Sequence, residues 1–177
     1  MRKFALAVVL LFTACAAFAD LNIKFGLDPF GEVRQVKRQN GITTLNPDFG
    51  VSLKGDYLRL VRQDVKAGLG LEYLFPRNMG KDTDFSYMPL YITAECTPFY
   101  EKEIFFKVNL GYNLLFNTNN SDIKNGIGGF YYAFGAGFEY DYGMTVALMF
   151  SSYYANTSSA DYIYNKIGID IGYKFNI

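Results

Sequence analysis

The sequence IGIDIGYKFNI, residues 167–177, alternates strictly between apolar residues and small or polar ones. One side carries Ile167, Ile169, Ile171, Tyr173, Phe175 and Ile177, and the other carries Gly168, Asp170, Gly172 and Lys174. A period of two residues predicts a β-strand with one apolar face. Its length matches the roughly 9–11 residues that a tilted membrane strand needs. What the apolar face contacts is decided by the rest of the chain.

Seven further stretches show the same alternation, and each has one face that is almost wholly apolar. They are residues 21–28, 48–57, 65–75, 87–97, 103–113, 129–140 and 143–154. Short links at 98–102 and 141–143 alternate with long polar links at 29–47, 76–86, 117–128 and 155–162. Residues 58–64, LRLVRQD, are expected to form the remaining turn, although they contain few turn-forming residues. This pattern predicts an all-β, eight-stranded antiparallel up-and-down barrel.

The first 19 residues have the features of a cleaved signal peptide. Arg2 and Lys3 precede an uncharged apolar run, and Ala17-Phe18-Ala19 forms a cleavage site for export through the Sec pathway. The expected mature chain, residues 20–177, is one barrel domain that keeps 15 basic and 17 acidic residues, so nucleic acid is not an expected partner. Cys96 is then the only cysteine, which excludes an intramolecular disulfide.

Alternation alone does not distinguish a membrane barrel from a soluble lipocalin-like barrel with an apolar lumen. The less apolar faces combine many glycines with single charges, which suits a narrow lumen better than a solvated exterior. The residues expected to point into the lumen include Lys24, Lys66, Glu72, Glu95, Lys107, Glu139, Asp170 and Lys174, with Lys54 beside them. The chain is therefore expected to be a transmembrane barrel.

Phe and Tyr make up 32 of the 177 residues, and many lie near strand ends. Near the long loops are Tyr73, Phe75, Phe85, Tyr87, Tyr112, Phe116, Phe130, Phe150, Tyr153, Tyr154 and Tyr164. Near the short turns are Tyr57, Phe99, Tyr100, Phe138, Tyr140, Tyr142, Tyr173 and Phe175. Two groups of this kind predict aromatic girdles at the two membrane interfaces.

The C-terminal pattern of Asp170, Gly172, Phe175 and Ile177 resembles the signal that the barrel-assembly machinery of Gram-negative bacteria reads. Residues 21–177 resemble the small outer-membrane β-barrel family of the OmpA-like and OmpX-like type, with the best matches in MPLYITAEC, KVNLGYN, GAGFEY and GYKFNI. The resemblance implies a multi-pass outer-membrane protein with periplasmic termini and four surface loops. The sequence departs from the family in its final Ile177, in its lack of Trp and in having no peptidoglycan-binding domain.

No catalytic residue, metal site or cofactor is expected. The chain has no His, so it lacks the general base that the lipid-modifying or protein-cleaving barrels of this membrane use. Arg34, Lys37 and Arg38 in the first long link could hold lipopolysaccharide phosphates, although such a cluster is more often a solvated loop. In the same link, Asn40-Gly41 predicts a hairpin that projects beyond the membrane.

The predicted function is a non-enzymatic, adhesin-like outer-membrane barrel. Its expected partners are outer-membrane lipid and lipopolysaccharide, the assembly machinery during insertion, and a host or cell-surface molecule at the loops. Two alternatives remain open. One is a porin-like channel for ions or small solutes, which the inward charges could line, although mutual pairing of those charges is favoured. The other is a soluble periplasmic lipid carrier.

Overall fold

The structure is a computed structural model that describes residues 19–37, 41–78, 84–98, 103–116, 128–156 and 160–176. Its strands are β1 (Ala19–Lys37), β2 (Gly41–Leu45), β3 (Gly50–Arg62), β4 (Val65–Asn78), β5 (Asp84–Cys96), β6 (Ile104–Phe116), β7 (Gly129–Glu139), β8 (Met144–Asn156) and β9 (Ala160–Asn176). No helix in these residues is long and apolar enough to cross a membrane. The predicted signal peptide, residues 1–18 and the side chain of Ala19, lies outside the described part.

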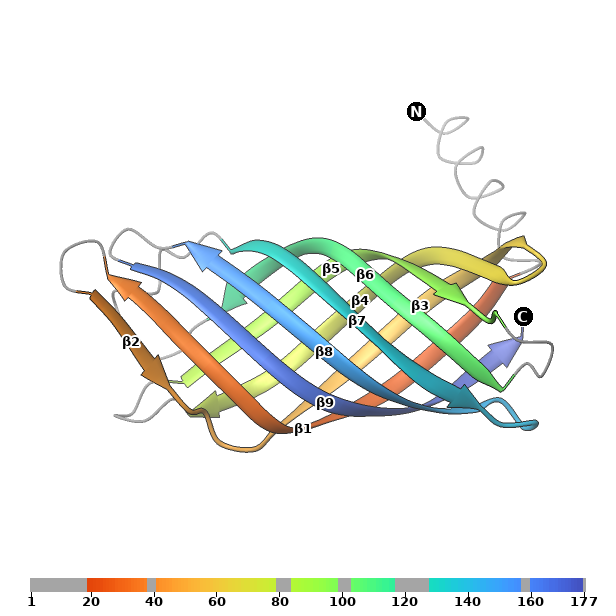
Figure 1. Cartoon of the computed structure of the whole chain (residues 1–177), viewed down its shortest axis with the longest axis horizontal. Coiled ribbons are helices and arrows are strands. Elements are labelled where there is room, and N and C mark those ends of the chain that lie inside the picture. The colour runs from red at the N-terminus through yellow and green to blue at the C-terminus, as the bar shows by residue number, and fades with distance from the viewer. Residues whose placement is uncertain are drawn as a thin grey trace, which may run out of the picture.

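Eight of the strands form a closed antiparallel barrel, which confirms the predicted fold class (Figure 1). From β3 to β9 each strand pairs with the next one in the chain, and β1 pairs with both β3 and β9. The seam between β1 and β9 extends from Asp20 opposite Asn176 to Lys37 opposite Ala160. Because the barrel closes there, the terminal strand has a partner along its length.

The long connections lie at one end of the barrel, here called the loop end, and the short ones at the other, the turn end (Figure 1). Along the middle of each strand, apolar side chains point outward and are exposed, while polar and charged ones are buried inside. The outward set includes Ile23, Phe25, Leu53, Leu69, Ile92, Val108, Phe134 and Ile169. A soluble lipid carrier needs the opposite arrangement, so the exterior is that of a barrel surrounded by lipid.

Two prolines coincide with register shifts in ladders, and a third lies in a link between strands. The β1–β9 register shifts between Leu27 and Phe30, around Pro29, and the β4–β5 register shifts between Leu74 and Arg77, around Pro76. Pro47 lies in residues 46–49, which separate β2 from β3. Proline has no N–H to donate to a ladder. The β1–β3 ladder ends at Asp28 opposite Gly50, and from Val33 towards the loop end β1 pairs with β2 instead.

Several strand boundaries expected from the sequence are wrong: β9 begins at Ala160 rather than at residue 167, β4 ends at Asn78 rather than at residue 75, and β5 begins at Asp84 rather than at residue 87. Residues 58–64 are not a turn, because β3 continues to Arg62 and only Gln63 and Asp64 form the turn. The first strand does not end at Asp28, because β1 continues to Lys37. In β1 and β3, residues with strand propensity extend the ladder beyond the length that a strand needs to cross the membrane.

Candidate functional site: charged lumen and loop-end ribbon

The turn-end half of the lumen contains six charged side chains from six strands. Asp56 accepts hydrogen bonds from Lys24 (2.5 Å), Lys107 (2.6 Å) and the hydroxyl of Tyr91 (2.9 Å). Lys174 donates to Glu95 at 3.0 Å and also to Glu139, and Glu95 lies 4.0 Å from Lys107. These six residues, Lys24, Asp56, Glu95, Lys107, Glu139 and Lys174, form the turn-end network. Their three positive and three negative charges cancel.

The loop-end network is a second set of six charges. Glu72 accepts from Lys166 (2.9 Å) and from the Tyr153 hydroxyl (2.9 Å), and it lies 3.5 Å from Lys54. Lys54 also pairs with Asp170 at 2.8 Å. Asp28 joins Lys166 at 2.9 Å to Arg77 at 2.7 Å. Arg77, Lys166 and Lys54 balance Asp28, Glu72 and Asp170, so this network is neutral as well.

Stacked aromatic rings fill the lumen between these charges and the loops. The ring centroids of Tyr87 and Tyr153 lie 5.4 Å apart, and those of Tyr153 and Tyr164 lie 5.5 Å apart. Phe85 packs edge to face on Tyr164 at 5.2 Å, and the Arg77 guanidinium lies 5.2 Å from the Tyr164 ring. The prediction that these four aromatic residues belong to the lipid girdle is therefore wrong. They lie in the inward phase of their strands.

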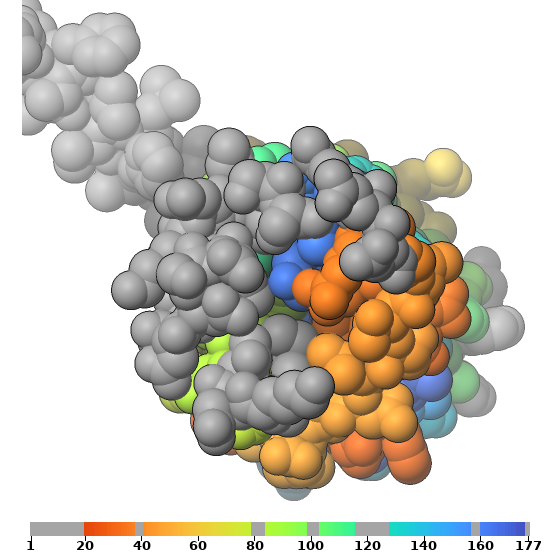
Figure 2. Space-filling model, turned by 90° about the vertical axis from the view of Figure 1, so that its left-hand side faces the viewer, coloured from red at the N-terminus to blue at the C-terminus, as the bar shows by residue number. Residues whose placement is uncertain are grey.

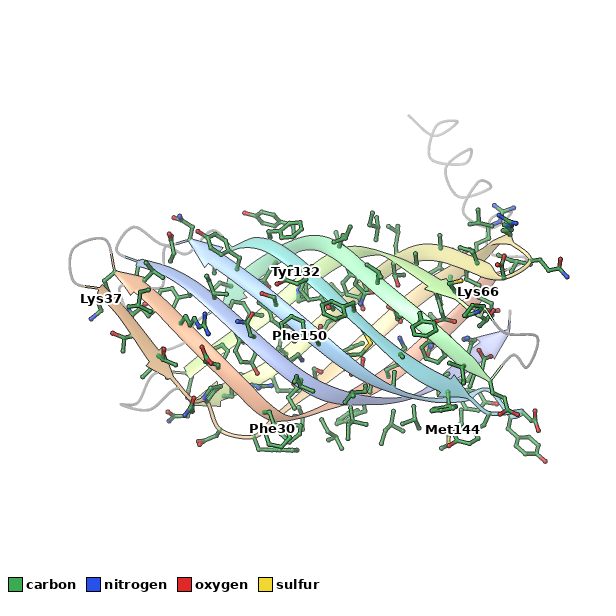
Figure 3. All side chains as sticks on the ribbon, in the orientation of Figure 1. Phe30, Lys37, Lys66, Tyr132, Met144 and Phe150 are labelled. Atoms are coloured by element: carbon green, nitrogen blue, oxygen red, sulfur yellow. The ribbon has the colours of Figure 1, made fainter. Side chains whose placement is uncertain are left out.

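Of the predicted girdle residues that the structure describes, several do point outward. Near the loop end these are Tyr73, Phe75, Tyr112 and Phe130, and near the turn end they are Phe138, Tyr140, Tyr142, Tyr173 and Phe175. Tyr132 and Phe150 also lie on the outside of the wall (Figure 3). Phe99, Tyr100 and the side chain of Phe116 lie outside the described residues. Two outward aromatic groups thus remain, and the loop-end group is smaller than predicted because Phe85, Tyr87, Tyr153 and Tyr164 lie in the lumen.

The structure places Lys24, Glu72, Glu95, Lys107, Asp170 and Lys174, all predicted lumen charges, deep inside the barrel. Lys66 and Glu139 lie at the turn end and are partly exposed, and Lys66 pairs with Asp20 at 2.6 Å (Figure 3). Four network residues were not among the predicted lumen charges, namely Asp28, Asp56, Arg77 and Lys166. Asp56 follows Lys54 by two residues, and Lys166 precedes Gly168 by two, so continued alternation predicts both.

At the loop end, residues 30–37 of β1 and the whole of β2 form a hairpin, here called the ribbon. Val33 to Lys37 pair with Leu45 to Gly41, and the other edge of β1 pairs with β9. Gly41 has a positive φ of 85°, which favours glycine at the end of the hairpin loop. Within the described residues β2 pairs with β1 alone, and its other edge faces no strand. Figure 2 shows the ribbon atoms at the loop end of the molecule.

Of the predicted lipopolysaccharide contacts, Arg34 and Lys37 lie on β1 rather than in a loop, and both are exposed. Figure 3 shows Lys37 at the far end of the ribbon. Arg34 forms an ion pair with Glu32 on the same strand. Arg38 lies outside the described residues. The expected three-residue basic cluster is therefore described only in part, and Glu32 compensates one of its charges.

The predicted assembly signal occupies the closing strand. Asp170 points inward to Lys54, Gly172 lies opposite Lys24, and Phe175 points outward opposite Leu21. Ile177 lies outside the described residues. The part that is described thus contributes to both the lumen network and the seam.

No protein-family model and no curated protein matches the sequence. Among solved structures, Ail, the attachment invasion locus protein of Yersinia pestis, gives a TM-score of 0.52 at 14% identity over 89% of this chain and 99% of Ail. Ail in complex with the heparin analogue sucrose octasulfate gives 0.52 at 15% identity over 89% and 99%. Neisserial surface protein A gives 0.54 at 11% identity over 88% of this chain and 97% of that protein. The chain therefore has the eight-stranded outer-membrane barrel fold that these proteins share.

Proposed function

We propose that the chain is a non-enzymatic outer-membrane protein that attaches to other surfaces through its loop-end ribbon. In this proposal the loop end faces outward, the turn end faces the periplasm, and the membrane-embedded barrel anchors the ribbon. The observation that carries the proposal is the edge of β2 that pairs with no other strand among the described residues, and β2 extends from a barrel whose interior is filled.

The ribbon is built to stand outside the hydrocarbon. Below the Pro29 irregularity, the outward residues of β1 are Leu21, Ile23, Phe25 and Leu27, whereas above Phe30 they include Glu32 and Arg34. Charged side chains facing outward are costly in lipid. Because β1 and β2 continue beyond this change, the ribbon is accessible to partners outside the membrane.

The edge of β2 lacks the features that usually prevent edge-to-edge association. Its sequence GITTL has no charge and no proline, its first four residues are exposed, and Ile42 is 70% exposed. Natural proteins commonly protect such edges with lysine, proline or a bulge. An unprotected edge of β-branched residues can accept an extended peptide as an added strand, which is a common mode of peptide recognition.

Two copies in one membrane do not satisfy this edge by pairing with each other. If two copies paired their β2 edges as antiparallel strands, a twofold axis perpendicular to the shared sheet would relate them. Two copies inserted in the same direction in one membrane are instead related by an axis along the membrane normal. The membrane normal lies in the plane of the barrel wall, so the same axis cannot be both along the normal and perpendicular to the sheet. The partner favoured for the β2 edge is therefore an extended segment of another molecule. The name of Ail, an attachment protein with this fold, supports the same function class.

The proposal is tested by attachment of cells that display the barrel. Replacing Ile42 and Thr44, which lie on the same face of β2, with lysine places two charges on that face next to the open edge while leaving the lumen unchanged. Attachment to a responsive surface is expected to fall by about tenfold or more, as for loss of a central contact. Replacing Tyr142, exposed at the turn end, with lysine is the matched control and should leave attachment unchanged.

Full attachment by the Ile42→Lys, Thr44→Lys variant, at equal surface display, would contradict the role of the β2 edge. Replacing Arg34 and Lys37 with glutamine tests the second binding mode. If these changes abolish attachment and a soluble polyanion competes with it, charge on β1 rather than strand addition holds the partner.

The filled lumen also predicts that the folded barrel does not conduct ions. The neutral networks and the stacked rings occupy the interior, and an eight-stranded barrel is just wide enough for its side chains. Planar bilayers with inserted, heat-modifiable protein should show the same current as protein-free bilayers. Discrete conductance steps would favour the channel alternative over packing.

A further inference from the structure

The end of β3 from Arg59 to Arg62 and the two-residue turn of Gln63 and Asp64 are together called the β3–β4 tip. It lies at the turn end, close to Lys66 (Figure 3). Leu60 is 57% exposed and Val61 is 70% exposed. Both residues belong to β3. Leu60 follows the buried Leu58 in the same phase but lies past the end of the packed lumen. Val61 lies at the register shift between Leu60 and Arg62. Two adjacent exposed aliphatic side chains are unusual at a strand end that meets water, and neither is buried in the lumen.

The same tip has an uncompensated positive charge. Arg59 is exposed and has no ion-pair partner among the described residues, and the side chain of Arg62 is 80% exposed. The Arg62 Nε lies 3.6 Å from Asp64, in an exposed pair of little strength. The tip therefore has two arginines against one aspartate. In contrast, the β7–β8 turn, residues 140–143, has two exposed tyrosines and an acidic Asp141.

The tip lies at the depth of lipid headgroups. Tyr57, opposite Leu21 on β1, is in the outward phase of β3 and is one of the aromatic residues predicted for the turn-end girdle. Arg59 is two residues further along β3, about 7 Å along the strand and less along the membrane normal, because the strands are tilted. The headgroup layer is roughly 5–8 Å deep on each side of the hydrocarbon. The guanidinium of Arg59 therefore reaches the level of the lipid phosphates.

We propose that the β3–β4 tip is a contact site for anionic phospholipid, in which Arg59 and Arg62 bind headgroup phosphates while Leu60 and Val61 enter the headgroup layer. Apolar side chains flanked by arginines are the combination that holds protein segments at an anionic membrane surface. The site rests on the membrane placement proposed above. It gives the barrel a preferred lipid on one side of its circumference, because the β7–β8 turn has the opposite charge.

The absence of Trp from the sequence allows a direct test. A Leu60→Trp variant has one tryptophan at an exposed position where substitution does not disturb the lumen. It is placed in phosphatidylcholine vesicles that contain brominated phosphatidylglycerol or, in a parallel sample, brominated phosphatidylcholine. The brominated anionic lipid is expected to quench the emission at a several-fold lower mole fraction. Adding Arg59→Gln or Arg62→Gln should reduce this preference by about fivefold per arginine.

A Tyr142→Trp variant is the matched control. It should be quenched by both brominated lipids without preference, because its turn is acidic. Three results would overturn the inference: water-like, unquenched emission from the Leu60→Trp variant, equal quenching by the two lipids, or shielded emission that neither lipid quenches, which would indicate a protein contact. Failure of the wild-type barrel to enter vesicles at all would instead refute the proposed membrane placement.

Discussion

Replacing Asp56 with asparagine is expected to destabilise the folded barrel by about 3–5 kcal/mol. The carboxylate is fully buried and accepts from Lys24, Lys107 and Tyr91. Asparagine preserves the shape of the side chain but removes its charge, so two buried ammonium groups lose their shared partner. The cost arises mainly from these unpaired cations, because the cost of burying them is no longer offset.

The measurement is a urea titration of the barrel in lipid vesicles, with the folded fraction read from heat-modifiable gel migration. Asp64→Asn is the matched control. Asp64 is partly exposed in a loose pair with Arg62, and its loss should change the free energy of unfolding by less than about 1 kcal/mol. Equal stability of the two variants would show that the turn-end network does not hold the barrel together.

A second change separates loss of charge balance from loss of packing. Lys107→Met removes one of the two ammonium groups that depend on Asp56. Alone it is expected to destabilise the barrel, but combined with Asp56→Asn it should cost less than the sum of the two single changes. Groups in one buried network typically couple by about 0.5–3 kcal/mol. Strict additivity would mean that the two residues act independently.

Alternation predicts most of the fold because the side-chain period of a strand is two, and one face must meet lipid. The same rule, applied without interruption, also predicts the lumen. Met144, Val146 and Leu148 point outward, so Tyr153 in the same strand points inward. Tyr153 was assigned to the aromatic girdle because it is close to a loop. Its position in the alternation of β8 predicts the direction of its side chain more reliably. The same alternation in β5 and β9 places Phe85, Tyr87 and Tyr164 inside the barrel.

Other features depend on relations between strands that a single sequence does not contain. Pro29 and Pro76 coincide with register shifts in the β1–β9 and β4–β5 ladders only because of the register that closes the barrel. Arg77 lies in a segment with the composition of a loop, yet its side chain passes over Gly50 of β3 to reach Asp28 of β1. A Cβ atom at Gly50 would lie 1.8 Å from the guanidinium carbon, so a larger residue there would require the Arg77 side chain to move away from Asp28. This close contact becomes visible only when the strands are placed together.

The ribbon shows the same limit. Asn40-Gly41 predicts a hairpin, and the structure has β1 and β2 on its two sides. That one edge of β2 pairs with no strand in the described part of the chain was not predictable, because the β1–β3 ladder ends at Asp28 and Gly50 and β2 pairs with β1 beyond that point. Local turn chemistry thus predicts that a hairpin forms, whereas the arrangement of the whole barrel decides which of its edges remains available.

Replacing Phe175 with aspartate is expected to reduce the amount of assembled barrel in cells by at least about tenfold, a change equivalent to about 1.4 kcal/mol or more. Phe175 points outward on the closing strand, opposite Leu21, and its ring lies 4.7 Å from that of Tyr173. A charge that faces lipid near an interface costs only roughly 0–1 kcal/mol. This lipid penalty alone would predict a smaller loss; the tenfold figure follows from the proposal that the C-terminal pattern is recognised during assembly.

Phe138→Asp is the control that separates these two causes. Phe138 also points outward near the turn end, with an exposed fraction similar to that of Phe175, but it lies on β7. Both variants should refold from urea into pure lipid vesicles almost as well as the wild type, because no assembly machinery is present there. In cells, measured by surface protease accessibility and heat-modifiable migration, only Phe175→Asp should fail. Equal loss for both variants would mean that the lipid-facing charge, and not the terminal pattern, limits assembly.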